Sequence, residues 1–412
     1  MPPRCAVVAV GLLAVLAGCT ARHRACAPAD LMRESGHVQL GPADDSAPVE
    51  TELLRSLVER TRTAGTPADP AAKSGKYLAL SGGGMYGAYS VGVLSGWTAA
   101  GNRPTFDAVT GVSTGALVAT YAFLGTEYDP QMVRLYTTVS DRDIYRRRPR
   151  TAVVFSDSAA SSEPLKRLIE AQVDDALLAA VARAHQSGRR LYVGTTNIDT
   201  RRLVVWDMGA IASSGRPDAA ALYRTVLLAS ASVPGFFPPV PIAVEVNGRT
   251  FNEMHVDGGA TTGVFLRAST LHLDREALKA GRQPLAGSDA YVIIAGKLYA
   301  DPSCTPPRAL EIGASALASI VSSQTRGELY RIYTLCLLGG MKYHLAAIPE
   351  NIAITSEAMD FNPAEMRRLY SAGYEAAIGG RAWRDTPPGS EPQEQTRPRT
   401  GTQFLAPGAA PR

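Results

Sequence analysis

Two glycine-rich turns, each between a strand-like run and a helix-like run, constrain the fold of this chain more than any other feature. The first turn is SGGG at 81–84, and the second is GVSTG at 111–115. A turn that leads directly from a strand into a helix is typical of βαβ units, whose strands lie parallel. The chain is therefore predicted to have an α/β fold, with a mainly parallel central sheet flanked by helices.

The rest of the central region repeats this alternation of strand-like and helix-like runs. We expect strands at 77–80, 106–110, 190–195, 203–206 and 291–295. A hairpin is predicted for 242–246 and 249–254, because the Asn247-Gly248 dipeptide suits the positive φ angles of a two-residue turn. We expect helices at 87–99, 115–123, 164–185, 218–228, 309–338 and 363–378.

The N-terminus has the pattern of an export signal. Residues 1–18 combine a charge at Arg4 with the apolar run Ala6–Ala17, which is too short to cross a bilayer but suits a secretory signal. The run ends in Leu-Ala-Gly-Cys19, which resembles the lipobox of bacterial lipoproteins. That resemblance implies cleavage before Cys19, its lipidation, and anchoring at the cell envelope. An outer-membrane location is expected, because Thr20 is not the Asp that retains lipoproteins at the inner membrane.

Two further segments are expected to lie outside the folded domain. Residues 19–75 are rich in Ala, Pro, Thr and Asp, and they are predicted to be a tether with one short helix. Residues 384–412 are rich in proline and poor in apolar clusters, which cannot offset the entropy lost on ordering, so a disordered tail is expected.

Composition excludes some classes of function. Lys and Arg number 42 against 38 Asp and Glu, and a net charge of +4 does not favour a nucleic-acid partner. With 45% hydrophobic and 19% charged residues, the chain is globular rather than disordered. No zinc-type Cys/His spacing, Walker loop or EF-hand sequence is visible, so neither a metal nor a cofactor is expected.

Three cysteines remain if Cys19 carries lipid. Cys26, Cys304 and Cys336 would then face an oxidising compartment, where one disulfide with one odd thiol is possible. Cys304 with Cys336 is the favoured pair because both lie in the folded region. The alternative is that all three are unpaired.

The first glycine-rich turn supplies backbone amides. Without side chains in the way, the N–H groups of Gly82, Gly83 and Gly84 can converge on an anion near the start of the following helix. Read literally, Gly82, Gly84 and Gly87 also satisfy the G-x-G-x-x-G pattern of dinucleotide sites. The motif alone does not decide between these alternatives.

The second turn favours catalysis by Ser113. In G-x-S-x-G, Gly111 and Gly115 make room for a sharp strand-to-helix turn that raises the serine hydroxyl above the sheet. A dinucleotide site would instead need an acid at the end of this strand, whereas Asp107 stands at its start. The alternative is a structural turn serine.

A third motif places a carboxylate at a turn. Asp257 leaves a strand-like run and enters Gly258-Gly259, which permit a tight bend and a close backbone approach. Taken alone, an Asp-Gly-Gly sequence is more often a plain turn.

These three motifs, in this order, resemble the patatin-like phospholipase family, and in particular its bacterial lipoprotein members. The resemblance extends over about 76–380, with further matches at 229–239 and 360–366. It implies a three-layer sandwich over residues 76–383. It also implies hydrolysis of phospholipid or lysophospholipid esters by a Ser-Asp dyad, without a cofactor.

The resemblance assigns roles to individual residues. Ser113 is the expected nucleophile, Asp257 the base, and Gly82, Gly83 and Gly84 the oxyanion hole. Many members of the family carry Arg or Lys where this chain has Met85 and Tyr86, so no cationic headgroup contact is expected there. The competing hypothesis is a non-catalytic envelope lipoprotein that keeps the fold for binding or scaffolding.

Several other residues are weaker candidates. Serine hydrolases of the α/β-hydrolase type use a histidine after the acid, but His272 and His344 fit surface or core roles better. His255, two residues before Asp257, is a candidate for supporting the site. The basic run Arg146, Arg147, Arg148 and Arg150 fits either anionic headgroups or a solvated loop, and Phe236 and Phe237 fit either an acyl pocket or the core.

Overall fold

The computed structural model describes residues 74–149, 156–246, 249–271, 280, 282–390 and 394 of the chain. Residues 301–320 belong to one compact unit, and the other described residues belong to a larger one. The predicted signal segment, Cys19 and nearly all of the predicted tether lie outside the described residues. None of the helices in the described ranges is long and apolar enough to cross a membrane.

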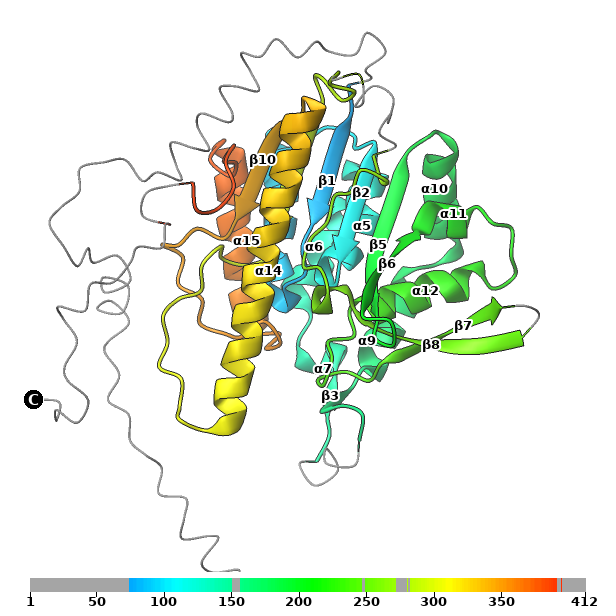
Figure 1. The fold of residues 1–412 in the computed structure, drawn as a ribbon, viewed down its shortest axis with the longest axis vertical. Helices are drawn as coiled ribbons and strands as arrows, with labels where there is room; N and C mark the ends of the chain where they lie inside the picture. The colour runs from blue at the N-terminus through cyan, green and yellow to red at the C-terminus, as the bar shows by residue number, and fades with distance from the viewer. Residues whose placement is uncertain are drawn as a thin grey trace, which may run out of the picture. The chain divides into compact units, whose positions relative to one another are not determined.

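An eight-stranded sheet forms the centre of the larger unit (Figure 1). Five neighbouring strands are parallel, which confirms the predicted sheet: β10 (Lys342–Ala347), β9 (Asp289–Ile294), β1 (Lys76–Leu80), β2 (Ala108–Val112) and β5 (Arg190–Asn197). Beyond β5 the pairing is antiparallel and involves β6 (Arg202–Asp207), β8 (Arg249–Asp257) and β7 (Val240–Val246). β7 and β8 are the predicted hairpin, whose two turn residues lie outside the described ranges.

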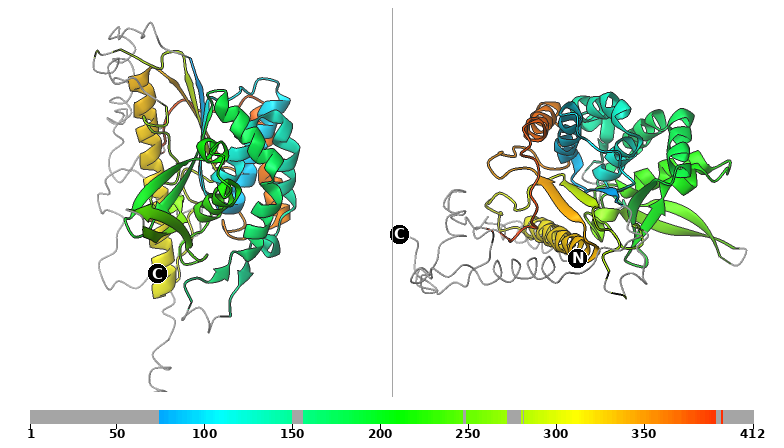
Figure 2. Two further views of the ribbon diagram at one scale, coloured as in Figure 1. Left: turned by 90° about the vertical axis from the view of Figure 1, so that its right-hand side faces the viewer. Right: turned by 90° about the horizontal axis from the view of Figure 1, so that it is seen from above.

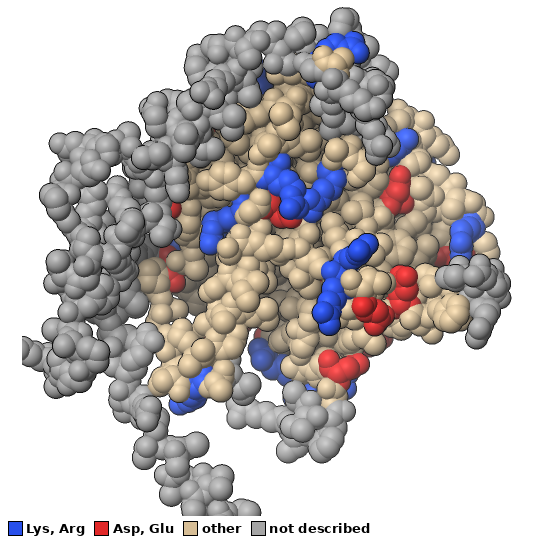
Figure 3. Space-filling view, viewed as in Figure 1, with Lys and Arg blue, Asp and Glu red and all other residues tan. Residues whose placement is uncertain are grey.

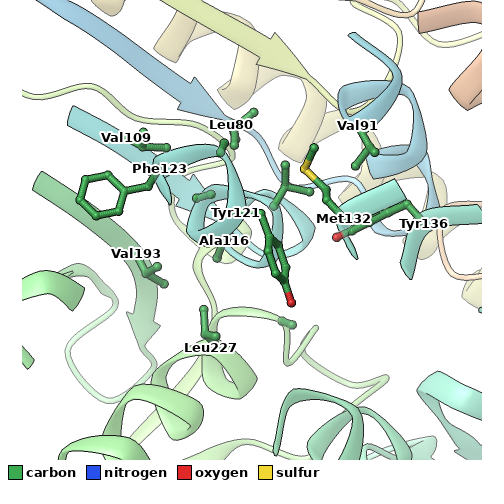
Figure 4. Close-up of a cluster of buried hydrophobic side chains, with 14 of the residues drawn as sticks. Leu80, Val91, Val109, Ala116, Tyr121, Phe123, Met132, Tyr136, Val193 and Leu227 are labelled. Carbon is green, nitrogen blue, oxygen red and sulfur yellow. The ribbon is translucent and has the colours of Figure 1, made fainter. Parts of the chain in front are cut away.

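Helices cover both faces of this sheet, as Figure 2 shows from the side. Side chains alternate along β1, so that Leu78 and Leu80 join one core while Tyr77 and Ala79 join another. The first core, part of which is drawn in Figure 4, packs against the larger group of helices. These are α4 (Gly87–Ala99), α5 (Thr114–Leu124), α6 (Asp129–Thr138), α9 (Glu163–Gln172), α10 (Asp175–Gln186), α12 (Ala219–Ser230) and α15 (Pro363–Ile378).

The second core lies under α14 (Ala309–Gly339), which begins in the smaller unit and continues in the larger one. Leu329, Ile332 and Cys336 of this helix are buried in that core together with Val292 of β9. The two faces confirm the predicted helix–sheet–helix layering. Short elements complete the larger unit: η1 (Gly84–Tyr86), η2 (Thr126–Tyr128), α7 (Asp141–Ile144), β3 (Arg146–Arg147), β4 (Ala160–Ser161), α11 (Met208–Ala212) and η3 (Gly258–Ala260).

In the described part of the smaller unit, residues 309–320 are helical. The hydroxyls of Thr305 and Ser315 form a hydrogen bond of 3.2 Å within it.

Some predicted elements differ from the structure. The single helix expected at 164–185 is two helices, because the side chain of Asp174 accepts a hydrogen bond from the Leu177 amide and starts α10. The strand expected at 106–110 is shifted to Ala108–Val112. Strand β10 and helix α6 were not predicted from the sequence.

The predicted disordered tail does not begin at residue 384. The backbone of Arg384 exchanges two hydrogen bonds with that of Leu345 on β10, and its guanidinium pairs with Glu394 at 2.7 Å. Pro387 and Pro388 are buried. These contacts order a segment whose composition alone indicated disorder.

The favoured disulfide is also wrong. Cys336 is a free, buried thiol, whereas Cys304 is disulfide-bonded, so the two do not pair. Burial raises the pKa of the Cys336 thiol to about 12, which makes it a poor nucleophile.

On the face drawn in Figure 3, the charged side chains of the described residues form small groups of both signs. Most of the described surface in this view carries neither acidic nor basic side chains. This distribution agrees with the small net charge of the chain.

Candidate active site

Ser113 occupies the sharp turn between β2 and α5. Its φ of 55° and ψ of −129° are strained for a residue with a side chain, at a cost of about 1–3 kcal/mol. Its backbone N–H donates to the hydroxyl of Ser230 at 3.0 Å, and 7% of the residue is exposed. This is the conformation that presents a serine hydroxyl above a sheet.

The two glycines around Ser113 are required by close backbone contacts. A Cβ at Gly111 would lie 2.4 Å from the carbonyl oxygen of Gly115. A Cβ at Gly115 would lie 2.5 Å from the carbonyl oxygens of both Leu80 and Ser81. The serine turn therefore packs directly against the first glycine-rich turn, as the parallel pairing of β1 and β2 requires.

Asp257 reaches Ser113 because β5 changes its partner at this point. On one edge, β5 pairs with β2 as far as Gly194, opposite Val112. The next residue, Thr195, pairs with Asp257 at the end of β8, while β6 occupies the other edge of β5. The ends of β2 and β8 therefore meet, which brings Ser113, the residue after β2, close to Asp257, the last residue of β8.

Gly258 permits this meeting of the two strand ends. A Cβ there would lie 2.5 Å from the Gly194 carbonyl oxygen and 2.9 Å from the Val112 side chain. The Asp-Gly pair is thus a close-approach site rather than only a plain turn.

The carboxylate of Asp257 is buried, with 4% of the residue exposed. Its Oδ1 accepts a hydrogen bond of 2.7 Å from the Gly259 amide, but its Oδ2 has no partner of normal geometry among the described residues. Burial raises the pKa of Asp257 to about 6, although the nearby Ser113 hydroxyl and the Gly259 amide act in the opposite direction. Asp257 is therefore a stronger base than a solvated carboxylate.

The three glycines of the first turn differ in whether their N–H groups are already hydrogen-bonded. The Gly82 N–H donates to the Gly263 carbonyl oxygen at 3.0 Å, so this amide is not available as an oxyanion donor in this conformation. No hydrogen bond of the described residues uses the N–H of Gly83 or Gly84. This corrects the prediction that all three amides are offered, because one of them secures the loop.

Two residues that followed the glycines in the sequence secure the loop as well. The Met85 amide donates to the Ala358 carbonyl oxygen at 2.8 Å, and the Tyr86 hydroxyl donates to the Ser356 carbonyl oxygen at 2.8 Å. The same segment explains Gly84, whose φ is 56° and whose Cβ would lie 2.0 Å from the Ala358 carbonyl oxygen.

A largely apolar pocket of about 90 Å³ lies beside these groups. Gly84, Ser113 and Thr114 are in its wall, so the nucleophile and candidate oxyanion amides face one space. Thr114 begins α5, and no hydrogen bond of the described residues uses its amide, as is usual for the first turn of a helix. Most of the remaining wall is apolar and includes Leu117, Leu135, Leu165, Ile169, Leu227 and Phe237.

Ser230 supports the turn and was not assigned a role from the sequence. Its side chain is fully buried, accepts from the Ser113 N–H and donates to the Gly194 carbonyl oxygen at 2.7 Å. It therefore joins the nucleophile turn to the middle of β5, at Gly194. The sequence offered Ser230 only as one residue of the family match at 229–239. Its role could not be read there, because its hydrogen-bond partners are distant in sequence.

His255 lies on the same strand as Asp257 but does not bond to Ser113. Its Nδ1 is 2.9 Å from the Thr195 hydroxyl, and its Nε2 is 3.0 Å from Glu253. His344 is bonded to Asp289 at 2.8 Å, and His272 lies outside the described residues.

One residue of the basic run, Arg147, contacts one residue of the Phe pair, Phe236. Arg147 stacks on Tyr145 and Phe236, at 5.4 and 5.9 Å from the ring centres, and its side chain is exposed. Of the two phenylalanines, Phe237 lines the pocket and Phe236 packs on Tyr145. Arg150 lies outside the described residues. Within the described ranges, no three His, Cys, Asp or Glu side chains gather in a metal-binding group.

Part of this chain is similar to known proteins. Residues 78–268 match the family model described as patatin-like phospholipase. A solved structure, that of VipD from Legionella pneumophila, aligns with a TM-score of 0.38 and 14% identity, covering 77% of this chain and 69% of that one. No curated protein matches the chain in sequence.

Proposed function

We propose that the chain is a serine acyl hydrolase that cleaves acyl esters of phospholipids or lysophospholipids, because residues 78–268 match the patatin-like phospholipase family model. One observation carries the proposal. A buried carboxylate oxygen of Asp257 with no hydrogen-bond partner of normal geometry lies beside the Ser113 hydroxyl, in a site that continues into an apolar pocket. Leaving such an oxygen unpaired is costly in a folded protein, and a serine proton is the group that it suits.

The reaction follows from these positions. Asp257 accepts the proton of Ser113 as its Oγ attacks the ester carbonyl carbon, and the acyl chain occupies the apolar pocket. The negative charge on the carbonyl oxygen is met by free amides of the glycine turn, with Gly84 in the pocket wall, and by the Thr114 amide.

Collapse of that intermediate expels the lipid alcohol, which takes the proton from Asp257 and leaves an acyl-enzyme. Asp257 then accepts a proton from water as the water attacks the acyl carbonyl. Release of the fatty acid returns the proton to Ser113.

The direct test is release of fatty acid from phospholipid and lysophospholipid in mixed micelles by the purified full-length protein. We expect release by the wild type, none above background by Ser113→Ala, and labelling of the wild type alone by a fluorophosphonate. A folded wild type that neither releases fatty acid nor takes up the label would contradict the proposal and favour the non-catalytic lipoprotein.

Activity should depend on pH through Asp257. Because its carboxylate must be ionised to act as base and its pKa is about 6, kcat/KM should be half-maximal near pH 6 and fall about tenfold per pH unit below it. The measurement is kcat/KM for an uncharged acyl ester between pH 4 and 9. The midpoint should move little with temperature, because a carboxyl group ionises with little heat. A pH midpoint near 4 would contradict the assignment of Asp257 as the base. So would a midpoint that shifts strongly with temperature, as the pKa of an imidazole does.

We also propose that the chain is anchored through a lipidated Cys19 at the cell envelope, in the outer membrane. The lipobox-like sequence before Cys19 supports this location. Mass spectrometry of the N-terminal peptide from cell envelopes tests it, and an unmodified Cys19 would exclude the anchor.

A further inference from the structure

Two glutamine side chains bridge the helices on either side of the pocket. The Gln131 carboxamide on α6 donates to that of Gln172 on α9, with Nε2 and Oε1 2.8 Å apart. Both residues are half-buried, and Gln172 is in the pocket wall whereas Gln131 is not.

The bridge lies at the end of the pocket remote from Ser113, because α5 and α6 run in opposite directions. Near the nucleophile, the Tyr136 hydroxyl on α6 bonds to the Thr114 hydroxyl on α5 at 2.6 Å. Near the other end of α5, Arg103 bonds both to Asp129, the first residue of α6, and to the Ala122 carbonyl oxygen. Gln131 stands two residues after Asp129 and is therefore level with the far end of α5.

The residues that line the pocket also run from Ser113 toward the bridge. Along α5 it is lined at Thr114, Leu117 and Tyr121, a distance of about 10 Å at the helical rise per residue. Figure 4 shows Tyr121 extending from α5 toward the side on which Leu227 lies. Both side chains line the pocket.

Helix α9 presents one stripe to the pocket, with the spacing of a single helix face. Leu165, Leu168 and Ile169 are apolar, and Gln172, one turn further on, is the first polar residue of the stripe. The next residue, Val173, also lines the pocket, and its carbonyl oxygen accepts two hydrogen bonds from Arg224 on α12. The end of α9 is therefore held in place, and the stripe becomes polar where Gln131 meets it.

We propose that the Gln131–Gln172 bridge is the end stop of the acyl pocket and sets the longest acyl chain that the enzyme accepts. The inference rests on the proposed function and deepens it. An acyl chain that ends before the bridge contacts mainly apolar side chains. A longer chain has to separate two carboxamides that satisfy each other, and a methylene cannot replace their hydrogen bond.

The test is a chain-length profile. We would measure kcat/KM for p-nitrophenyl esters from butanoate to hexadecanoate, at a fixed surface concentration in detergent micelles, with the purified full-length protein. The wild type should show a sharp fall beyond one length. Gln172→Ala should move that fall by two or more carbons and raise kcat/KM about tenfold for the first ester beyond the wild-type limit.

Two further variants separate the bridge from simple volume. Gln131→Ala breaks the hydrogen bond from the side that is outside the pocket wall, and it should move the limit in the same direction by a smaller amount. Gln186→Ala, an exposed glutamine on α10, is the matched control and should leave the profile unchanged. Thermal melting of each variant shows that it is folded.

The outcomes distinguish failure of this inference from failure of the proposed function on which it rests. An unchanged limit in both bridge variants would overturn the inference alone. A shift in Gln172→Ala without one in Gln131→Ala would also overturn it, since side-chain size rather than the bridge would then set the limit. If the wild type hydrolyses no ester in a Ser113-dependent manner, the proposed function fails and the inference with it.

Discussion

Ser113→Ala and Asp257→Asn should each lower kcat/KM for an acyl ester by at least about 1,000-fold, because nucleophile and base act as one unit. Ser113→Ala removes the atom that forms the acyl-enzyme. Asp257→Asn keeps the size of the side chain and can still accept from the Gly259 amide, but it cannot take the serine proton. The measurement is steady-state hydrolysis of a short acyl ester, with fluorophosphonate labelling in parallel.

The two variants together also test the coupling between the residues. The double variant should be about as inactive as the worse single variant, since either change alone stops the same step. Asp257→Asn should remain folded, because burial already disfavours the charge that it removes. Asp218→Asn, which changes an exposed carboxylate paired with Arg216, is the control and should be fully active.

Retained activity would have clear consequences. If Asp257→Asn keeps most of its kcat/KM, another group takes the proton and the dyad is wrong. The described histidines offer little replacement, since both ring nitrogens of His255 already have partners in Thr195 and Glu253.

Gly84→Ala should lower kcat by at least about 100-fold and change KM little, because its free amide is a candidate donor to the oxyanion. Gly84 has a φ of 56°, and a Cβ there would lie 2.0 Å from the Ala358 carbonyl oxygen. The turn has to move to admit a methyl group, and a donor that moves by even a small distance no longer meets the developing charge. The measurement is kcat and KM for the same ester.

Gly101→Ala is the matched control for Gly84→Ala. Gly101 also has a positive φ, 76°, but nothing lies within 4 Å of its would-be Cβ, and it stands at the end of α4. It should therefore show the backbone strain without the loss of activity. Normal kcat in a folded Gly84→Ala protein would contradict the oxyanion role of this turn.

The sequence by itself determined the features that depend on local chemistry. Strand, glycine turn and helix around Ser113 could be predicted because only glycines at 111 and 115 tolerate such close backbone contacts. The alternation of apolar runs was enough for a parallel sheet with helices on both faces. The break at Asp174 was readable in principle, because aspartate is a preferred residue at a helix start, but a continuous apolar stripe obscured it.

Only the tertiary structure decided how distant segments combine. The exchange of partners along β5 places Asp257 beside Ser113, and the Ser230 hydroxyl links the Ser113 turn to Gly194 within β5. The partner of the Gly82 amide and the Gln131–Gln172 bridge likewise join residues far apart in the chain. Local pattern cannot specify such contacts, because which edge pairs and which groups bond depends on how the whole sheet and its helices pack.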